Sequence, residues 1–456
     1  MRISLADAKL VRCMGAMVAV LTICIASAQQ RGSDGLGDRL YPRLGNGGYD
    51  AQHYDIALRF EPQENHIRAT TTITAIATED LSSFNLDLHG LSVASVMVDG
   101  GSAAFERVGS ELVIRPAQSL TRGATFTTAV DYAGVPQPIV DPGASFHKLG
   151  WQTWEDGYFA AVSEPSGAMN WFPSNNHPSD KATYLMRITV PADLVAVANG
   201  VLAEVIVNDD SARSFVWRMD QPMASYLTIV AVGDYIEARD DSGPVPIRNY
   251  FPAGTDADIL SGYDITHEIM TWLIETIGPY PFTEYGVVVV PGYPVALETQ
   301  TISTFGDVAP DPLVIVHELA HQWFGNSVSP GSWEDIWLNE GFATYFMALY
   351  HETHGPQGAE FLFSSIHIDL LPPGDIEVAE LFGPGVYFRG ALTLHALRTE
   401  VGNAVFFDIL REYYRRHAYS LVTTADFITT AEDVSGRELD ALFDAWLYGE
   451  QMPSLP

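Results

Sequence analysis

Apolar and polar residues alternate with a period of two in a series of short runs between Tyr49 and Tyr235. The runs are rich in Thr, Val and Ile and are separated by Gly, Pro and Asp, which is typical of strands joined by turns. Examples are HYDIALRF, ATTTITAIA, TFTTAVDYAG and YLMRITVP. This pattern predicts an all-β domain, a sandwich or a saddle-shaped sheet, over residues 49–237.

The spacing of apolar residues becomes helical in the second half of the chain. It predicts a helix over 259–277, which the turn sequence GPYPF then ends, and a buried strand at YGVVVVP. Further helices are expected over 312–325, 334–353, 390–401 and 403–415. The sequence therefore predicts an α+β chain in which the β domain precedes a mostly α domain over residues 238–456.

The first residues of the chain read as an export signal. Basic residues precede the apolar stretch Cys13–Ile25, and small residues follow it up to Ala28, the expected cleavage position. A buried N-terminal helix is the alternative. Residues 29–48, rich in Gly, Arg and Asp, are predicted to be a linker. We expect a periplasmic or extracellular protein whose mature chain, without cysteine, folds by core burial alone.

The composition excludes several classes of function. There are 24 Lys and Arg against 57 Asp and Glu, a net charge of −33, so phosphate backbones would be repelled and nucleic-acid binding is not expected. With 47% hydrophobic and 18% charged residues, the chain has enough apolar material for large cores. No run in the mature chain is long and apolar enough to predict a membrane span.

The segment VIVHELAHQWFG contains the most specific functional motif in the chain. His317 and His321 are four residues apart, so on a helix both rings point to one side and can share one metal ion. Glu318 lies beside them, in reach of a water that such a metal activates. A catalytic zinc needs a third protein ligand, and Glu340 on the next predicted helix can supply it. Taken alone, Glu340 is also consistent with an exposed helix residue.

Two other segments offer substrate contacts. GYPVALETQTIST reads as an edge strand whose backbone near Ala296 can hydrogen-bond a peptide as an added strand. Glu298, further along the same segment, can pair with a substrate ammonium group, although an exposed strand carboxylate explains it equally well. Tyr387 begins an amphipathic helix behind a Gly-Pro-Gly turn, where a phenol can stabilise an oxyanion or simply pack.

The combination of HELAH, WLNEGFATY, ALET and VYFRGA resembles the gluzincin aminopeptidases of the aminopeptidase N and leukotriene hydrolase family. The likeness extends over most of the mature chain, and we expect a short form without the long helical C-terminal domain. The resemblance implies a β domain followed by a thermolysin-like catalytic domain. It also implies one zinc ion per chain, bound by His317, His321 and Glu340.

The same resemblance implies an aminopeptidase that removes the N-terminal residue from peptides with a free N-terminus, and the export signal makes it a secreted one. Glu318 would be the general base, Tyr387 the catalytic tyrosine and Glu298 the glutamate of the exopeptidase motif. Glu164, in the run SEPSG, resembles a position whose Gln or Glu also contacts the substrate amine. A solvated loop carboxylate is the alternative for Glu164.

Three residues depart from the family pattern. Val295 and Thr299 replace the Gly and Asn of the exopeptidase motif, so side-chain preference does not carry over. Arg389 stands where Lys is usual, which keeps the charge but changes the hydrogen-bond geometry. Two other functions remain open from the sequence: a thermolysin-like endopeptidase with the same zinc site, and a non-catalytic peptide-binding protein on the same fold.

Overall fold

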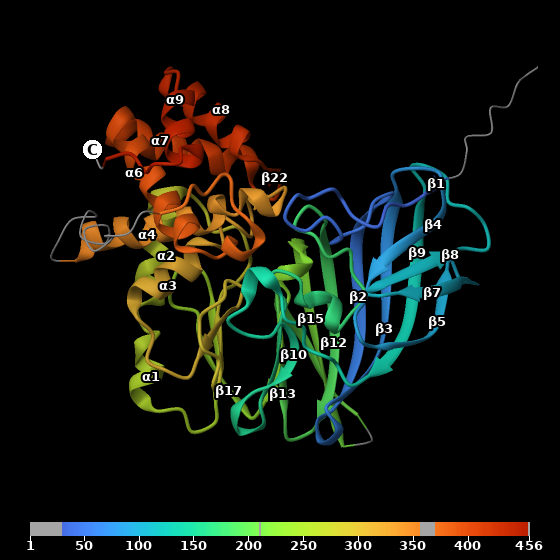
Figure 1. The fold of residues 1–456 in the computed structure, drawn as a ribbon. Coiled ribbons are helices and arrows are strands. Elements are labelled where there is room, and N and C mark those ends of the chain that lie inside the picture. The colour runs from blue at the N-terminus through green and yellow to red at the C-terminus, as the bar shows by residue number, and fades with distance from the viewer. Residues whose placement is uncertain (1–29, 209–210, 356–369, 455–456) are drawn as a thin grey trace, which may run out of the picture.

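The structure is a computed structural model that describes residues 30–208, 211–355 and 370–454. The predicted export signal, residues 1–28, lies outside these ranges and stays a prediction. Figure 1 shows one half built of strands, in blue to green, and another that carries the long helices, in yellow to red. The expected order of a β half followed by a mostly helical half is confirmed.

An eight-stranded sheet forms the centre of the first half, with the order β14-β15-β12-β2-β3-β9-β5-β6. Its strands are β2 (Tyr49–Glu61), β3 (His66–Ala77), β5 (Ser92–Val98), β6 (Gly101–Ser102), β9 (Thr125–Gly134), β12 (Lys181–Pro191), β14 (Val201–Val207) and β15 (Ala212–Ala224). β2 pairs antiparallel with β3 and parallel with β12. Buried and more exposed residues alternate along β2, so the period of two in the sequence matches the two faces of the sheet.

Two four-stranded sheets complete the first half. One contains β1 (Gln30–Arg31), β4 (Leu81–Asp87), β7 (Ala104–Val108) and β8 (Glu111–Arg115), and the other β10 (Gly150–Thr153), β11 (Phe159–Val162), β13 (Val195–Ala198) and β16 (Val230–Gly233). Phe60 of β2 packs edge-on against Trp151 and Phe159 of the second sheet, with ring centroids 4.8 and 4.6 Å apart. The core between these sheets is therefore largely aromatic.

The second half combines a small sheet with helices. The sheet has the order β17 (Tyr235–Asp240), β18 (Ile247–Pro252), β19 (Val287–Val290) and β20 (Ser303–Gly306), and β21 (Ser329–Pro330) pairs with β22 (Leu421–Val422). The helices are α1 (Ala257–Gly262), α2 (Thr266–Ile277), α3 (Pro312–Ala320), α4 (Trp337–His354), α6 (Gly390–Val401), α7 (Asn403–His417), α8 (Thr424–Ser435) and α9 (Asp440–Phe443). Among the described helices, none has the length and apolar character needed to cross a bilayer.

Several boundaries differ from the sequence-based expectation. The helix expected over 259–277 is divided into α1 and α2 by a turn, and the helix expected over 312–325 ends at Ala320. The chain turns there because Gly325 adopts a positive φ of 127° and Asn326 donates its N–H back to the His321 carbonyl. The expected domain boundary after residue 237 falls inside β17, which pairs with β18 of the second sheet.

The prediction of a linker over residues 29–48 is wrong for the described part of that segment. Leu40, Tyr41 and Leu44 are buried, and the carboxylate of Asp38 accepts hydrogen bonds from Ser332 Oγ (3.0 Å) and the backbone N–H of Trp333 (2.8 Å) in the second half. The segment therefore packs against both halves. The polar composition of the segment did not indicate burial. Asp38 is buried because its carboxylate accepts hydrogen bonds from protein donors instead of from water.

The two halves are also joined by a lysine. The Lys181 ammonium group on β12 donates to Asn326 O (3.0 Å), Ser327 O (3.0 Å) and Ser329 Oγ (2.9 Å), in the loop that follows α3. Three donors thus meet three acceptors, and all three acceptor residues are fully buried. Lys181 stabilises the docking of the β half onto the loop behind α3.

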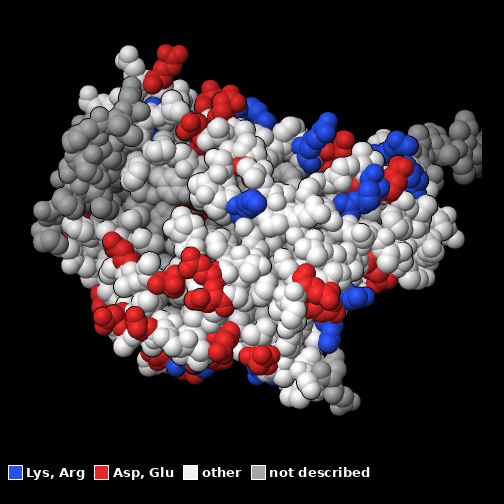
Figure 2. Space-filling model, turned by 60° about the horizontal axis from the view of Figure 1, so that its bottom comes forward, with Lys and Arg blue, Asp and Glu red and all other residues white. Residues whose placement is uncertain are grey.

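Acidic side chains dominate part of the surface. On the face shown in Figure 2 they gather on the left, over the second half, whereas most Lys and Arg lie to the right, over the β half. A surface with this distribution attracts cations towards the helical half.

Lys181→Met should lower the free energy of unfolding by about 2 kcal/mol, because it removes three hydrogen bonds and leaves the buried Ser327 carbonyl without the lysine donor. Urea denaturation would measure this. Lys148→Met is the matched control, since Lys148 is exposed, and it should change the free energy by less than about 0.5 kcal/mol. Equal effects of the two substitutions would contradict the role given to Lys181.

Candidate metal centre and its cavity

Helix α3 begins at a strong local signal and carries the first histidine. Asp311 caps the helix by accepting the N–H of Leu313 (2.8 Å), and Pro312 takes the first helical position. His317 lies in the last turn, and His321 is the residue directly after the helix, still in helical conformation. Both rings therefore project from the same side, as their spacing predicts.

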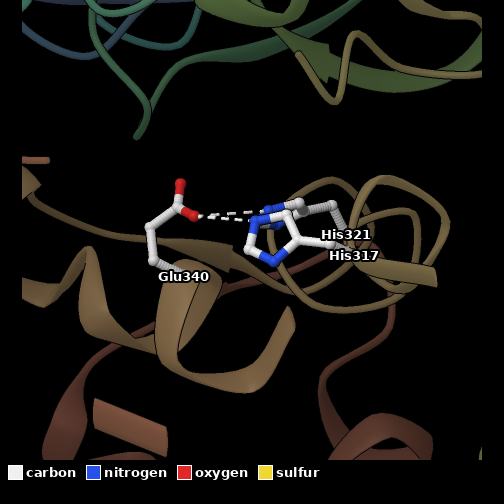
Figure 3. A group of neighbouring side chains, drawn as sticks. All are labelled: His317, His321 and Glu340. Carbon is white, nitrogen blue, oxygen red and sulfur yellow. Dashed lines mark hydrogen bonds and ion pairs between the residues drawn. The ribbon is translucent and has the colours of Figure 1, made fainter. Parts of the chain in front are cut away.

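The two histidines meet Glu340 from helix α4, as Figure 3 shows. One carboxylate oxygen, Glu340 Oε2, lies 3.2 Å from His317 Nε2 and 3.5 Å from His321 Nε2. All three potential ligand atoms lie within 4.8 Å of one another. The structure thus brings together the three predicted metal ligands, from two helices that are separate in the sequence.

The spacing of these three groups suits zinc. Bonds of about 2.0–2.1 Å in a tetrahedron place neighbouring ligand atoms about 3.3 Å apart, close to the two distances that involve Glu340. His321 Nδ1 lies 3.3 Å from the carbonyl oxygen of Phe324, so it can donate there and leave Nε2 for the metal. His317 Nδ1 is buried and has no hydrogen-bond partner among the described residues.

Helix α4 approaches helix α6 at two glycines. A Cβ on Gly341 would lie only 2.9 Å from the Cα of Gly390, so the two backbones are in direct contact. Glu340 precedes the first glycine, and Tyr387 lies one turn before the second. This close approach brings the third ligand and the candidate catalytic phenol to the same cavity.

Tyr387 lies in η8 (Gly385–Arg389), a π-helical turn that runs into α6. Its ring stacks on His317 with centroids 5.9 Å apart and an interplanar angle of 15°. Burial, together with the carboxylate of Glu340, raises the pKa of Tyr387 well above its ordinary value, so the hydroxyl stays a donor. Arg389 anchors this turn by donating to Trp446 O (2.7 Å) and Leu370 O (2.8 Å).

Glu298 and Glu164 reach the same cavity from different segments. Glu298 lies in a loop rather than in the expected edge strand, since Leu297 and Thr304 form a single isolated bridge. The loop is held because the carbonyl of Glu298 accepts from Asn326 Nδ2 (2.8 Å) and Gln322 Nε2 (3.2 Å). Glu164 is buried at 5% exposure, so it is not a solvated loop carboxylate.

A second carboxylate group therefore lies next to the metal ligands. Carboxylate oxygens of Glu164, Glu298 and Glu340 all lie within 4.8 Å of one another. Oε1 of Glu164 and Oε1 of Glu298 are buried and accept no hydrogen bond from the described residues. Oxygens in this position can accept hydrogen bonds from a bound cation.

The protonation of these groups reflects their crowding. Burial and the charge of Glu298 raise the pKa values of Glu164 and Glu318 well above the ordinary range. Burial acts to raise the pKa of Glu340 as well, but His321 and His317 outweigh it and lower that pKa to about 2. Burial acts to lower the pKa of His321, but Glu298 and Glu340 raise it to about 10.

All eight predicted site residues line one cavity of about 110 Å³. Ala296 is on its wall, and its backbone N–H and C=O form no hydrogen bond with other described residues. The sequence did not indicate five further wall residues, Ala144, Phe146, His147, Tyr293 and Phe382. Their loops carry no metal-ligand or carboxylate spacing, so only the tertiary contacts place them here.

This arrangement can hold a divalent metal between a carboxylate base and a phenol donor. Such a site, set between a β half and a helical half, defines the metal-dependent hydrolases that carry an HExxH helix. Residues 50–227 match the Peptidase M1 N-terminal domain, and residues 262–446 match the Peptidase family M1 domain. The chain belongs to peptidase family M1, and the family resemblance expected from its motifs is confirmed.

Solved and curated relatives support this assignment. An M1 zinc metallopeptidase from Deinococcus radiodurans is similar with a TM-score of 0.86 and 33% identity, over 92% of this chain and 98% of that one. Aminopeptidase N of Streptomyces lividans is 25% identical over 87% of this chain and 50% of its own length. Aminopeptidase 2 of Candida albicans is 24% identical over 86% of this chain and 46% of its own. The chain spans half or less of the length of these two curated relatives.

Glu340→Ala should abolish stoichiometric zinc binding, because only two protein ligands remain. Metal analysis after dialysis against a weak chelator would measure this. Glu275→Ala is the matched control, since Glu275 is an exposed glutamate on helix α2, and it should keep about one zinc ion per chain. Full zinc content in the Glu340 variant would remove Glu340 from the ligand set.

Proposed function

We propose that the protein is an exported, zinc-dependent aminopeptidase that removes the N-terminal residue from peptides. Curated relatives are named aminopeptidases. A Deinococcus radiodurans M1 zinc metallopeptidase variant, 33% identical to this chain, was solved bound to a Tyr-Ser-Ala substrate. These names describe other proteins. In this chain, the side chains at the site support the same activity.

The observation that carries the proposal is the pair of glutamates beside the metal ligands. Glu164 and Glu298 each have a buried oxygen that accepts no hydrogen bond from the described residues, and His321 Nδ1 lies 4.0 Å from that of Glu298. Among the described residues that line the cavity none is Lys or Arg. Such carboxylates are costly to bury unless a cation binds them. The α-ammonium group of a peptide is a cation of the right size, and its capture places the first peptide bond at the metal.

The chemistry can be assigned to individual side chains. A zinc ion held by His317, His321 and Glu340 would polarise the scissile carbonyl and activate the attacking water. Glu318 takes a proton from that water and passes it to the departing amine. Tyr387 donates its hydroxyl proton as a hydrogen bond to the oxyanion, an interaction that strengthens towards the transition state.

Two features support export. The leader pattern up to Ala28 is typical of a secretory signal, and residues 29–456 contain no cysteine that an oxidising compartment would modify. An exported aminopeptidase would process peptides in the periplasm or outside the cell.

Peptides with an acetylated N-terminus should be cleaved with kcat/KM lower by about a hundredfold or more than the same peptides with a free N-terminus. The acetyl group removes the charge that Glu164 and Glu298 bind, and loss of one partner of a buried charge pair costs about 2–5 kcal/mol. Reporter peptides of identical sequence would be compared at saturating zinc. Equal cleavage of both forms would favour the endopeptidase alternative.

Glu318→Gln should keep one zinc ion per chain and lower kcat by about a thousandfold, because glutamine cannot take up the proton of the attacking water. Zinc content and turnover would be measured on the same preparation. Glu275→Gln serves as the control on an exposed helix position and should match the wild type. Near-normal turnover in the Glu318 variant would remove Glu318 from the role of base.

A further inference from the structure

A short segment ahead of both family-matched regions lies against the cavity walls. The match to the M1 N-terminal domain begins at residue 50. Upstream of it, Asp38 Oδ1 accepts the backbone N–H groups of Leu40 (2.8 Å) and Tyr41 (2.9 Å), which fixes a tight turn. Asp38 Oδ2 accepts from Trp333 N (2.8 Å) and His177 Nε2 (3.2 Å). The turn is therefore bound to both halves of the molecule.

The turn places the Tyr41 side chain next to a second buried aspartate, Asp141. Tyr41 is only 8% exposed, its ring packs 6.0 Å from that of Trp333, and its hydroxyl donates to Asp141 Oδ1 at 2.5 Å. Burial and the charge of Asp141 raise the pKa of Tyr41, so the phenol remains protonated and keeps donating.

Asp141 collects donors from three segments. Its Oδ1 also accepts the N–H of Gly143 (2.8 Å), and its Oδ2 accepts the hydroxyl of Ser166. The donors to Asp141 among the described residues are a phenol, a backbone N–H and a hydroxyl, none of them cationic, so these three bonds stabilise the buried carboxylate. Loss of the Tyr41 hydroxyl would leave that carboxylate short of one donor.

The segments tied to Asp141 are those that form the amine end of the cavity. Ser166 is two residues after Glu164, and its carbonyl is held in turn by Asn176 Nδ2 at 2.9 Å. Gly143 begins the loop that carries Ala144, Phe146 and His147 into the cavity wall. A Cβ on Gly143 would lie 2.4 Å from the Tyr41 hydroxyl, so the loop lies directly on this tyrosine.

We propose that Tyr41 is a positioning residue for substrate binding: through Asp141, its hydroxyl sets the place of Glu164 and of the wall loop 142–147. This inference rests on the proposed aminopeptidase function, because it concerns how the substrate ammonium group is held. Tyr41 touches neither substrate nor metal. Its effect is on the binding of a free N-terminus and not on the step that breaks the bond.

Tyr41→Phe removes one oxygen atom and keeps the packing against Trp333. We expect KM for a peptide with a free N-terminus to rise about tenfold, because the loss of a hydrogen bond to a charged group has an effect of about that size. We expect kcat to change by less than about threefold. The slow cleavage of the acetylated peptide should not change, because that peptide does not use Glu164. Zinc content should stay at one per chain.

Tyr49→Phe is the matched control for a merely structural effect. Tyr49 is buried to a similar extent at 6% exposure, and its hydroxyl donates to the backbone carbonyl of Asn85 at 2.9 Å, within the β half. It should lower thermal stability about as much as Tyr41→Phe but leave KM unchanged. Equal KM values for Tyr41→Phe and the wild type, or an equal rise in KM for both variants, would overturn the proposal.

Substitutions of Asp141 give an independent test. Asp141→Asn keeps an oxygen that can accept from Tyr41 and Gly143, so KM should rise less than in Asp141→Ala, which loses all three bonds. The same rise in both variants would contradict the assigned geometry. A wild-type protein that cleaves no peptide would overturn the proposed function and this inference together. If the wild type is active and Tyr41→Phe leaves KM unchanged, only the inference about Tyr41 is overturned.

Discussion

Four carboxylates share one cavity with three imidazoles, two of them those of the predicted metal ligands, and no Lys or Arg lines the cavity within the described residues. This excess of negative charge is the constraint on which the rest of the site depends. Buried carboxylates need either protons or cations, and burial with the charge of Glu298 raises the pKa values of Glu164 and Glu318 well above the ordinary range. A divalent metal ion and a substrate ammonium group both compensate this negative charge. The binding of each therefore depends on the same group of carboxylates.

The charge also explains why both halves of the chain are needed. Glu164 comes from the β half, Glu298 from a loop after β19, and the other two carboxylates from helices α3 and α4. Neither half alone contains the complete cavity. Contacts that dock the halves, such as those of Lys181 and Asp38, therefore act on the site as well as on stability.

Local signals in the sequence predicted much of this arrangement. The period of two predicted the β half, and the spacing of His317 and His321 placed both on one face, because such patterns depend only on backbone geometry. The family motifs singled out Glu164, Glu298, Glu340 and Tyr387, which the structure brings to the same cavity; their roles stay predictions. The linker prediction failed because Asp38 bonds to residues far along the chain. His147 and Tyr293 were missed for the same reason, since their position comes from loops that only the folded chain brings together.

The contact between Gly341 and Gly390 has a consequence for the substitutions that the site tolerates. Because neither glycine has a side chain, no substitution can bring helices α4 and α6 closer together. Any larger residue at either position would push the helices apart, and with them Glu340 and Tyr387. The shape of the rest of the cavity depends on the loops around residues 142–147 and 293–299.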